Sequence, residues 1–258
     1  MKTISIINQK GGVGKTTTAI NLSYGLYEKG NKVLMVDLDS QGSLTRARGI
    51  NNPDDLSNDL SNLFNKLMSD MEYDTKKSII KIKEGLDILP CNIKLTSIEN
   101  RVTSTLSREY LLRDILNQIE NEYDYAVIDC SPSLNIFTIN ALTTTDEIVI
   151  PITPSGLSMA GAVDLLKSIT KVKNKINHNL NIAGMLLTMV DKRSNYVKEF
   201  IENINKIENI NIFKTEIPCS VKAIEPLKKG ISAIEHDRNS KISKSYLLFT
   251  DELINDAR

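Results

Sequence analysis

A glycine-rich stretch near the amino terminus has the residue types and spacing of a phosphate-binding loop. It follows a strand-like run, opens a helix-like segment, and consists of Gly11, Gly12, Val13, Gly14, Lys15, Thr16 and Thr17. Glycines let backbone N–H groups close on phosphate oxygens, and the amino terminus of a helix adds a favourable dipole. In such a loop Lys15 would contact the β and γ phosphates, and the Thr16 hydroxyl would bind magnesium. Lys10, just ahead of the glycines, is one lysine more than this loop needs.

Two other apolar runs end in carboxylates that suit the same chemistry. The run from Val33 leads to Asp37 and Asp39, and the run from Tyr125 leads to Asp129. If the extended geometry persists to Asp39, alternation along the strand points Asp37 and Asp39 to the same side. Ligands of open parallel sheets bind beyond the carboxyl ends of the strands, so we expect these carboxylates near the phosphates.

The aspartates differ in the role that we expect of them. Asp39 is the better candidate to hold the attacking water or a magnesium-bound water. Asp129 stands where a carboxylate holds magnesium, directly or through water, beside the threonine of the loop. The alternative for Asp37 and Asp39 is a capped turn with solvated carboxylates.

The elements that must position these residues follow from the apolar pattern. Most apolar runs are continuous rather than alternating, which is typical of strands covered on both faces, and helical stretches lie between them. The pattern predicts an α/β fold with a mostly parallel sheet, helices on both faces and right-handed crossovers. The predicted strands are 3–7, 33–36, 125–128, 148–150, 182–187 and, more weakly, 210–213. A chain of 258 residues without a visible linker predicts a single domain over 1–258.

Two further segments are predicted to be helical. The polar segment 51–84 is expected to form a peripheral helix, because its apolar residues recur at helical spacing: Leu56, Leu60, Leu63, Phe64, Leu67 and Met68. A second helix is expected from about Ser104 to Asn121. Its apolar face would consist of Leu106, Tyr110, Leu111, Ile115, Leu116 and Ile119.

Composition excludes several classes of protein. The chain has 32 basic and 32 acidic residues, so nucleic-acid binding through bulk charge is disfavoured, although a local basic patch would escape this count. Three widely spaced cysteines suggest neither a disulfide framework nor a zinc site, and a reduced cytoplasmic setting fits best. No apolar stretch approaches the roughly 20 residues that a membrane-spanning helix needs, and we expect no signal peptide.

Several motifs together resemble one family. Residues 10–17, K-G-G-V-G-K-T-T, resemble the deviant Walker A motif of the ParA/MinD superfamily of P-loop ATPases. Residues 36–42 resemble the V-D-x-D-P-Q-G segment of ParA/Soj proteins, and residues 128–134 and 138–142 resemble I-D-x-P-P-S-L and T-x-N-A-L. Residues 187–193 and 217–222 resemble the carboxyl-terminal T-x-x-D-x-R and I-P-x-x-V-x regions, so the matches reach about residue 240.

The resemblance implies a P-loop NTPase that uses ATP and Mg²⁺, and it implies roles for individual residues. Lys15 and Thr16 would bind phosphate and magnesium, Asp39 would position the hydrolytic water, and Asp129 would support the metal. Lys10 is similar to a signature lysine that contacts the partner's phosphates across a nucleotide-sandwich homodimer, as an arginine finger does. Adenine would lie near Met189, Asp191 and Pro218.

The tail and the basic residues indicate which member of the superfamily this is. The final residues carry Asp251, Glu252 and Asp256 against Arg258, which disfavours a membrane-binding helix of the MinD type. With no helix-turn-helix segment ahead of the loop, the chain resembles a small ParA. This resemblance implies an ATP-bound dimer that binds nonspecific double-stranded DNA and associates with the nucleoid. It also implies that the dimer segregates a plasmid or chromosomal locus with a ParB-like partner.

The residues expected to contact DNA match the family pattern only in part. Residues 192–244 hold 11 Lys or Arg against 7 Asp or Glu. Arg193 matches a DNA-contact arginine of the family and Lys222 stands where another is often found, whereas Cys219 replaces a frequent arginine. A MinD-like or scaffold-based positioning ATPase, or an ATP-dependent regulator without segregation activity, remains the alternative.

Overall fold

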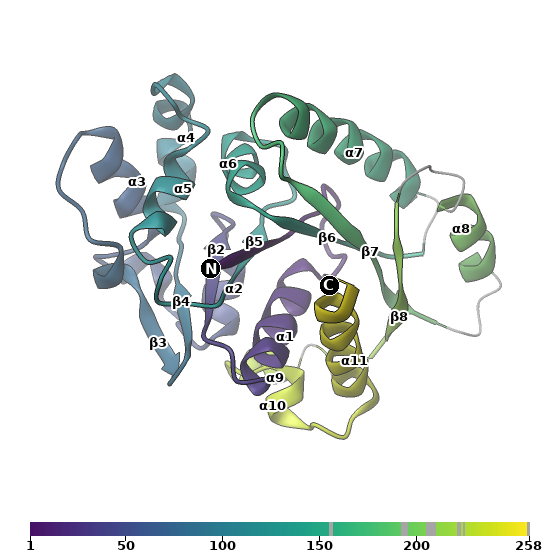
Figure 1. Ribbon diagram of the computed structural model, residues 1–258. Coiled ribbons are helices and arrows are strands. Elements are labelled where there is room, and N and C mark those ends of the chain that lie inside the picture. The colour runs from purple at the N-terminus through teal and green to yellow at the C-terminus, as the bar shows by residue number, and fades with distance from the viewer. Residues whose placement is uncertain (155–156, 192–195, 205–209, 221–222, 224, 257–258) are drawn as a thin grey trace.

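A computed structural model describes residues 1–258 except 155–156, 192–195, 205–209, 221–222, 224 and 257–258. In these residues a central sheet has eight strands in the order β3-β4-β2-β5-β1-β6-β7-β8 (Figure 1). Only β3 and β4 pair antiparallel; the other neighbours are parallel. The strands are β1 (Lys2–Ile6), β2 (Val33–Leu38), β3 (Ile80–Lys83), β4 (Leu86–Leu89), β5 (Tyr125–Cys130), β6 (Glu147–Ile152), β7 (Asn181–Val190) and β8 (Ile212–Pro218).

Helices cover both faces of the sheet (Figure 1). One face carries α1 (Lys15–Glu28), α2 (Ser43–Ala47), α9 (Glu225–Lys228), α10 (Ala233–His236) and α11 (Lys241–Asp256). The other carries α3 (Leu60–Met68), α4 (Lys94–Ser104), α5 (Leu111–Asn117), α6 (Ile136–Thr144), α7 (Leu157–Lys175) and α8 (Tyr196–Ile204). The predicted α/β fold with a mostly parallel, doubly covered sheet is confirmed.

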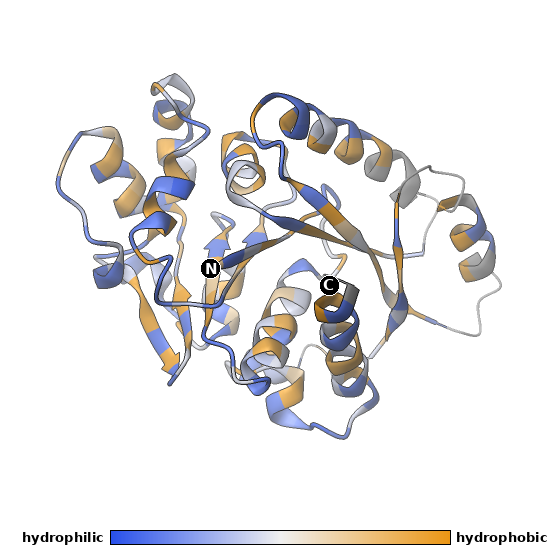
Figure 2. Cartoon of the chain, viewed as in Figure 1, coloured by the Kyte–Doolittle hydropathy of each residue, from blue (hydrophilic) through white to orange (hydrophobic). Residues whose placement is uncertain are grey.

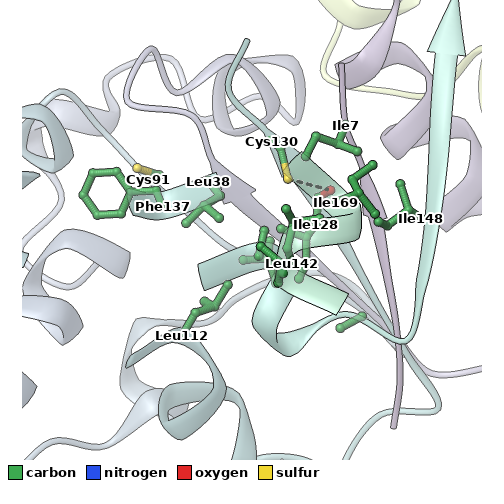
Figure 3. Packing of buried hydrophobic residues seen from close by; sticks show 14 of the residues in the cluster. Ile7, Leu38, Cys91, Leu112, Ile128, Cys130, Phe137, Leu142, Ile148 and Ile169 are labelled. Atoms are coloured by element: carbon green, nitrogen blue, oxygen red, sulfur yellow. Dashed lines mark hydrogen bonds between the residues drawn. The ribbon is translucent and has the colours of Figure 1, made fainter. Parts of the chain in front are cut away.

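Burial on both faces explains why the central strands are continuous apolar runs. Along β2, Leu34, Val36 and Leu38 pack into the cluster under α3 to α8, whereas Val33 and Met35 pack under α1 and α11. Figure 2 shows hydrophobic residues concentrated on the strands and on the helix sides that meet them. Figure 3 shows the first cluster from close by, where residues of β5 meet residues of α6. Period-two alternation disappears because both strand faces are buried.

The segment 51–84 differs from the single peripheral helix that its pattern predicts. It contains two 3₁₀ turns, Pro53–Asp55 and Thr75–Ser78, a nine-residue helix α3, and the strand β3 at the edge of the sheet. The helical spacing is real over α3, where Leu60, Leu63 and Phe64 are buried. Asp59 caps α3 by accepting a hydrogen bond from the Asn62 N–H at 2.8 Å, which fixes its start.

The hairpin of β3 and β4 was missed, although the sequence carries a signal for it. Alternation in 79–83 and the run 86–89 flank Glu84-Gly85, a two-residue connection of the kind that antiparallel hairpins use. Gly85 has φ 86°, a left-handed conformation that glycine adopts without strain. The apolar residues at helical spacing earlier in the segment led us to predict a helix for all of 51–84, so the strand was not predicted.

The helix predicted from about Ser104 to Asn121 is also too long. The structure has α5 over seven residues only and ends a separate helix, α4, at Ser104. Its expected apolar face is buried at Leu111, Ile115, Leu116 and Ile119, whereas Leu106 is 91% exposed. The connection between α4 and α5 turns at Ser107, where φ is 53°, so one continuous helix cannot form.

Sheet order brings the chemistry-bearing strand ends together. β5 lies between β2 and β1, and in its register Asp129 stands beside Asp37 of β2 and beside Ile6 of β1. The loop that follows β1 therefore begins at the same edge as the two carboxylate-bearing strand ends. This is the edge where ligands of open parallel sheets bind.

Candidate nucleotide-binding site

The loop between β1 and α1 has the backbone of an anion cradle. Gly12 and Gly14 have φ 73° and 85°, so a side chain at either would be strained, and Gly14 stands at the amino-terminal cap of α1. Two contacts hold the loop in place. The Lys10 N–H donates to Asn8 Oδ1 at 2.9 Å, and the Thr188 hydroxyl of β7 donates to the Val13 carbonyl at 2.8 Å.

Lys15 begins α1 and folds back over the loop. Its side chain is buried, with 8% of the residue exposed, and Nζ donates to the Lys10 carbonyl at 3.2 Å. Burial lowers the pKa of Lys15, while the negative charges of Asp129 and Asp39 counter part of that effect. An ammonium group has three donors, so it retains the capacity to bind phosphate oxygens inside the loop.

Thr16 and Asp129 form the part of the site that suits a magnesium ion. The Thr16 hydroxyl donates to Asp129 Oδ2 at 2.6 Å, while the other carboxylate oxygen, Oδ1, is buried without a hydrogen-bond partner. Burial raises the pKa of Asp129, and the neighbouring Asp37 carboxylate adds to this effect. A buried acceptor that lacks a partner is costly, and a cation bound beside it would satisfy it.

This pair fits Mg²⁺ better than it fits a metal held by protein alone. Within the described residues no three His, Cys, Asp or Glu side chains group as metal ligands. Mg²⁺ commonly uses one or two protein oxygens, several waters and substrate phosphates. One hydroxyl and one carboxylate beside a phosphate loop match that ligand set.

Asp37 and Asp39 take different environments rather than a shared one. Asp37 is wholly buried, and its oxygens accept hydrogen bonds from the Asp39 N–H at 3.2 Å and from Thr45. Burial raises the pKa of Asp37 to about 7, although the bonds from Thr45 oppose the shift. β2 ends at Leu38, so extended geometry does not persist to Asp39, which is half-buried. The condition under which Asp37 and Asp39 would point to the same side is therefore not met, because the strand ends before Asp39.

Asp39 lies at the rim of a cavity beyond the loop. The cavity is bounded by the turn after β2, the turn after β5 and α4, and its wall includes Gln41, Glu99, Ser131 and Ser133. Asp39 Oδ1 accepts the Gln41 N–H at 3.0 Å. A half-buried carboxylate at a cavity wall can orient a water molecule.

A second pocket opens on the other side of the loop. Its wall includes Thr17, Met189, Pro218, Ile242 and Tyr246, and apolar surface predominates there. Met189 has φ 53°, a left-handed conformation that is uncommon for a residue with a side chain, and such strain clusters at functional sites. Apolar walls beside a phosphate loop suit the faces of a nucleotide base.

Comparison with known proteins identifies the chain. The family model described as an AAA domain matches residues 1–182. The sporulation initiation inhibitor protein Soj of Bacillus subtilis is 38% identical over 256 residues, which cover 98% of both chains. The chain belongs to the ParA/Soj family. The chromosome partitioning protein ParA of Caulobacter vibrioides is 33% identical over all of this chain and 96% of its own.

A solved structure extends the likeness from sequence to shape. The cobyrinic acid a,c-diamide synthase from Mycobacterium smegmatis, determined with a bound ATP analogue and magnesium, superposes with a TM-score of 0.86. It is 28% identical and the match covers 99% of this chain and 95% of that one. The family predicted from the motifs is thus confirmed, and the ParA/Soj fold carries the site described above.

The structure describes two of the other sequence-predicted residues of this ParA/Soj chain, Lys10 and Asp191, but not the expected DNA contacts. Lys10 is half-buried at the start of the loop, and Asp191 is exposed just beyond the end of β7. Arg193 and Lys222, the expected DNA contacts, lie outside the described residues. Within the described residues, no helix is sufficiently long and apolar to cross a membrane.

Two acidic residues of the tail, Asp251 and Glu252, have structural contacts in this ParA/Soj chain. Asp251 pairs with Lys29, just after α1, and Glu252 accepts the backbone N–H groups of Lys214 and Thr215 at 2.6 and 2.9 Å. Tyr246, Phe249 and Leu253 bury the inner face of the same helix. α11 is therefore part of the fold, packed between α1 and β8.

Sequence reasoning missed three residues that shape the site. Asn8 and Thr188 hold the loop through the bonds given above, and Thr45 holds Asp37. Thr188 lies inside the 187–193 motif, which is a signal that it is part of the site, but no role was predicted for it. Thr45 lies eight residues after Asp37, and that spacing acquires meaning only once α2 folds back on β2.

Proposed function

We propose that this protein is a Mg²⁺-dependent ATPase that dimerises on ATP, binds nonspecific DNA and segregates a plasmid or chromosomal locus with a ParB-like partner. The observation that carries the proposal is the Thr16–Asp129 pair beside Lys15. The unpartnered Asp129 oxygen favours a bound cation, and the buried Lys15 ammonium favours a bound polyphosphate. The nucleotide-bound relative from M. smegmatis supports ATP and Mg²⁺ as those ligands.

Each residue of the loop then has a role in hydrolysis. Lys15 and the N–H groups of residues 11–17 bind the β and γ phosphates, and Thr16 and Asp129 hold Mg²⁺, the latter directly or through water. Bound there, the metal would neutralise charge on the phosphate oxygens. Asp39 would orient the attacking water or, as the alternative, hold a magnesium-bound water.

The base would occupy the apolar pocket beside the loop. Met189 and Pro218 would contact adenine, and Asp191, just beyond the end of β7, would approach its edge. The pocket shares Gly14 and Thr17 with the phosphate loop, so one molecule of ATP can reach both.

Lys10 supplies the reason to propose a dimer. Lys15 already serves the chain's own phosphates, and Lys10 precedes the loop at its half-buried edge. We propose that Lys10 contacts the phosphates bound by a second copy of the chain. A cation supplied in trans would couple hydrolysis to assembly.

DNA binding would follow from dimerisation. Arg193 and Lys222 are the proposed phosphate contacts, and a dimer doubles their number. The ATP-bound protein would then associate with the nucleoid in the cytoplasm, and a ParB-like partner would stimulate hydrolysis. The name of the C. vibrioides relative, a chromosome partitioning protein, supports this use of the family's ATPase.

Retention on random-sequence DNA tests the proposal as a whole. Wild-type protein should be retained with ATP and Mg²⁺ but not with ADP, and the logarithm of its affinity should fall with the logarithm of salt by about 0.9 per phosphate contact. Lys15→Ala should abolish retention because the loop can no longer hold ATP. Lys32→Ala, at an exposed lysine remote from the loop, is the matched control and should bind as wild type.

Absence of ATP-dependent retention at low salt would contradict the DNA-binding part of the proposal. It would favour a positioning ATPase that uses a protein scaffold or a membrane. Retention that is equal with ATP and ADP would contradict the proposed nucleotide switch.

A further inference from the structure

Thr45 is a wholly buried residue of α2 that contacts Asp37 near the end of β2, two residues before the proposed catalytic Asp39. Its backbone N–H and its hydroxyl donate to Asp37 Oδ2 at 2.8 and 2.7 Å. The Cys91 N–H, just past the end of β4, donates to the same hydroxyl at 3.1 Å. An N–H can only donate, so the hydroxyl accepts from Cys91 and directs its single proton at Asp37.

The other oxygen of Asp37 continues this chain of hydrogen bonds to Asp39. Asp37 Oδ1 accepts the Asp39 N–H at 3.2 Å, and the Asp39 carbonyl accepts the Gly42 N–H at 2.8 Å. A path of hydrogen bonds thus runs from Cys91 through Thr45 and Asp37 to the backbone of Asp39. Every protein group on that path except Asp39 is buried.

The turn after β2 is also packed closely against the end of β4. Gly42 has φ 60°, and a Cβ placed there would lie 3.0 Å from the Cys91 carbonyl oxygen. The turn therefore has little room to shift toward β4. The position of the turn depends on the polar contacts of Asp37 with the Asp39 N–H at one end of the turn and with Thr45 at the other.

We propose that Thr45 is a positioning residue for hydrolysis, which fixes the Asp39 carboxylate through Asp37. The inference rests on the proposed ATPase activity. Thr45 is too deeply buried to meet the nucleotide, so it acts through Asp37. Its hydroxyl orients the Asp37 carboxylate, and that carboxylate anchors the N–H of the residue that orients the attacking water. Small displacements of a positioned catalytic group cost large factors in rate.

Thr45→Val tests the inference because valine keeps the shape and the backbone N–H but lacks the hydroxyl. The turnover number should fall by about tenfold, as expected when one hydrogen bond to a charged group is lost. The dissociation constant for ATP should stay within about twofold of wild type, because Lys15, Thr16 and Asp129 are untouched. Thr45→Ser, which retains the hydroxyl, should recover most of the rate.

Thr75→Val is the matched control. Thr75 is equally buried, and its hydroxyl donates to the Ile115 carbonyl at 2.9 Å, on the far side of the sheet from α2. It should lose a similar amount of thermal stability without a change in turnover number. Thr45→Val should also retain its ATP-bound dimer for longer than wild type, which a loss of stability alone would not cause.

Two results would overturn the inference. One is a wild-type turnover number in Thr45→Val; the other is a loss of rate in Thr45→Val that Thr75→Val matches. If Thr45→Val does not fold, Asp37→Asn replaces it, because asparagine has one acceptor oxygen and cannot satisfy both Thr45 and Asp39; an unchanged turnover number there would overturn the inference equally. A wild-type protein that does not hydrolyse ATP would contradict the proposed function itself.

Discussion

At the scale of single residues, the site buries charged groups, which lowers the stability of the folded protein. Asp129 is buried with one oxygen unpaired, and burial raises its pKa. Lys15 is buried with the Lys10 carbonyl as its neighbour, and its pKa is lowered. Residues that serve stability alone seldom have unmet polar groups of this kind, whereas groups awaiting a ligand do. The same two side chains should therefore oppose stability and support binding.

Asp129→Asn tests this opposition. Asparagine keeps the shape and can still accept the Thr16 hydroxyl, but it removes the buried charge. The nucleotide-free variant should melt at a higher temperature than wild type, while its affinity for Mg²⁺-ATP should fall by at least about tenfold, since a carboxylate ligand is lost. Calorimetry without and with the nucleotide measures both effects.

Asp124→Asn is the control for that experiment. Asp124 precedes β5 at the opposite end of the strand, where Oδ2 accepts the Lys32 N–H at 2.7 Å. Its substitution should leave nucleotide affinity unchanged. A decrease in the melting temperature of Asp129→Asn would show that Asp129 is a stabilising residue, contrary to this account.

At the scale of elements, a buried ion pair fixes α2 to α10. Arg48, just after α2, donates to Glu235 Oε2 at 2.9 Å, and both side chains are nearly wholly buried. Lys83 of β3 pairs with Glu235 Oε1 at 2.8 Å, and Ser232 completes a capping box with Glu235. The helix that carries Thr45 is thus anchored to the carboxyl-terminal part of the chain and to the edge hairpin.

Glu235→Gln should reveal this anchor through its pH dependence. Burial alone would raise the pKa of Glu235, but the hydrogen bonds from Lys83 and Ser232 and the charge of Arg48 outweigh it, so the pKa is lowered. A lowered pKa in the folded state contributes stability above the unfolded pKa of about 4.5, and that contribution is lost as pH falls through the folded value.

The variant should therefore unfold more easily than wild type by roughly 3 kcal/mol at pH 7, because Arg48 loses its buried carboxylate. The difference should shrink at a pH well below 4.5, where Glu235 becomes progressively protonated in the folded state as well. Denaturant unfolding at both pH values measures it. Glu225→Gln, in an exposed pair with Lys229, should cost less than about 1 kcal/mol at either pH. A difference for Glu235→Gln that does not change with pH would contradict the assignment.

Elements also show how much the sequence could predict. The six strands with apolar runs were found. In the inner strands, burial on both faces leaves an unbroken apolar run, whereas the edge strand β8, predicted more weakly, has only two buried residues. The hairpin of β3 and β4 was missed, because its outer strand is half-exposed and the helical spacing of Leu60, Leu63 and Phe64 dominated the segment. The start of the helix predicted from about Ser104 was misplaced, because a left-handed turn at Ser107 that no residue type announces separates α4 from α5.

The same limit applies to the site. Motif spacing predicted that Lys15, Thr16 and Asp129 lie close together, because each stands at the end of a strand or the start of a helix, and the structure brings them together. The contact between Thr45 and Asp37 was not predicted, since it depends on how α2 folds back over β2. Contacts between elements are decided by packing, which a single sequence read locally does not contain.

At the scale of the whole molecule, the loop after β1 and the carboxylates at the ends of β2 and β5 meet at one edge of the sheet, with α4 and α11 on either side. Lys10 lies at the outer end of this arrangement. The central proposal is that a second copy of the chain completes the site by bringing its own Lys10 to the bound phosphates. The residues that hold ATP and the residue that completes the site then belong to different subunits.

Mixing two inactive variants tests this most directly. Lys10→Ala keeps Asp39, and Asp39→Ala keeps Lys10, so a mixed dimer contains one complete site although neither homodimer has any. Phosphate release from ATP and Mg²⁺ by the mixture should clearly exceed the sum of the two variants measured alone. Wild-type turnover by Lys10→Ala alone, or a mixture no faster than that sum, would contradict the account.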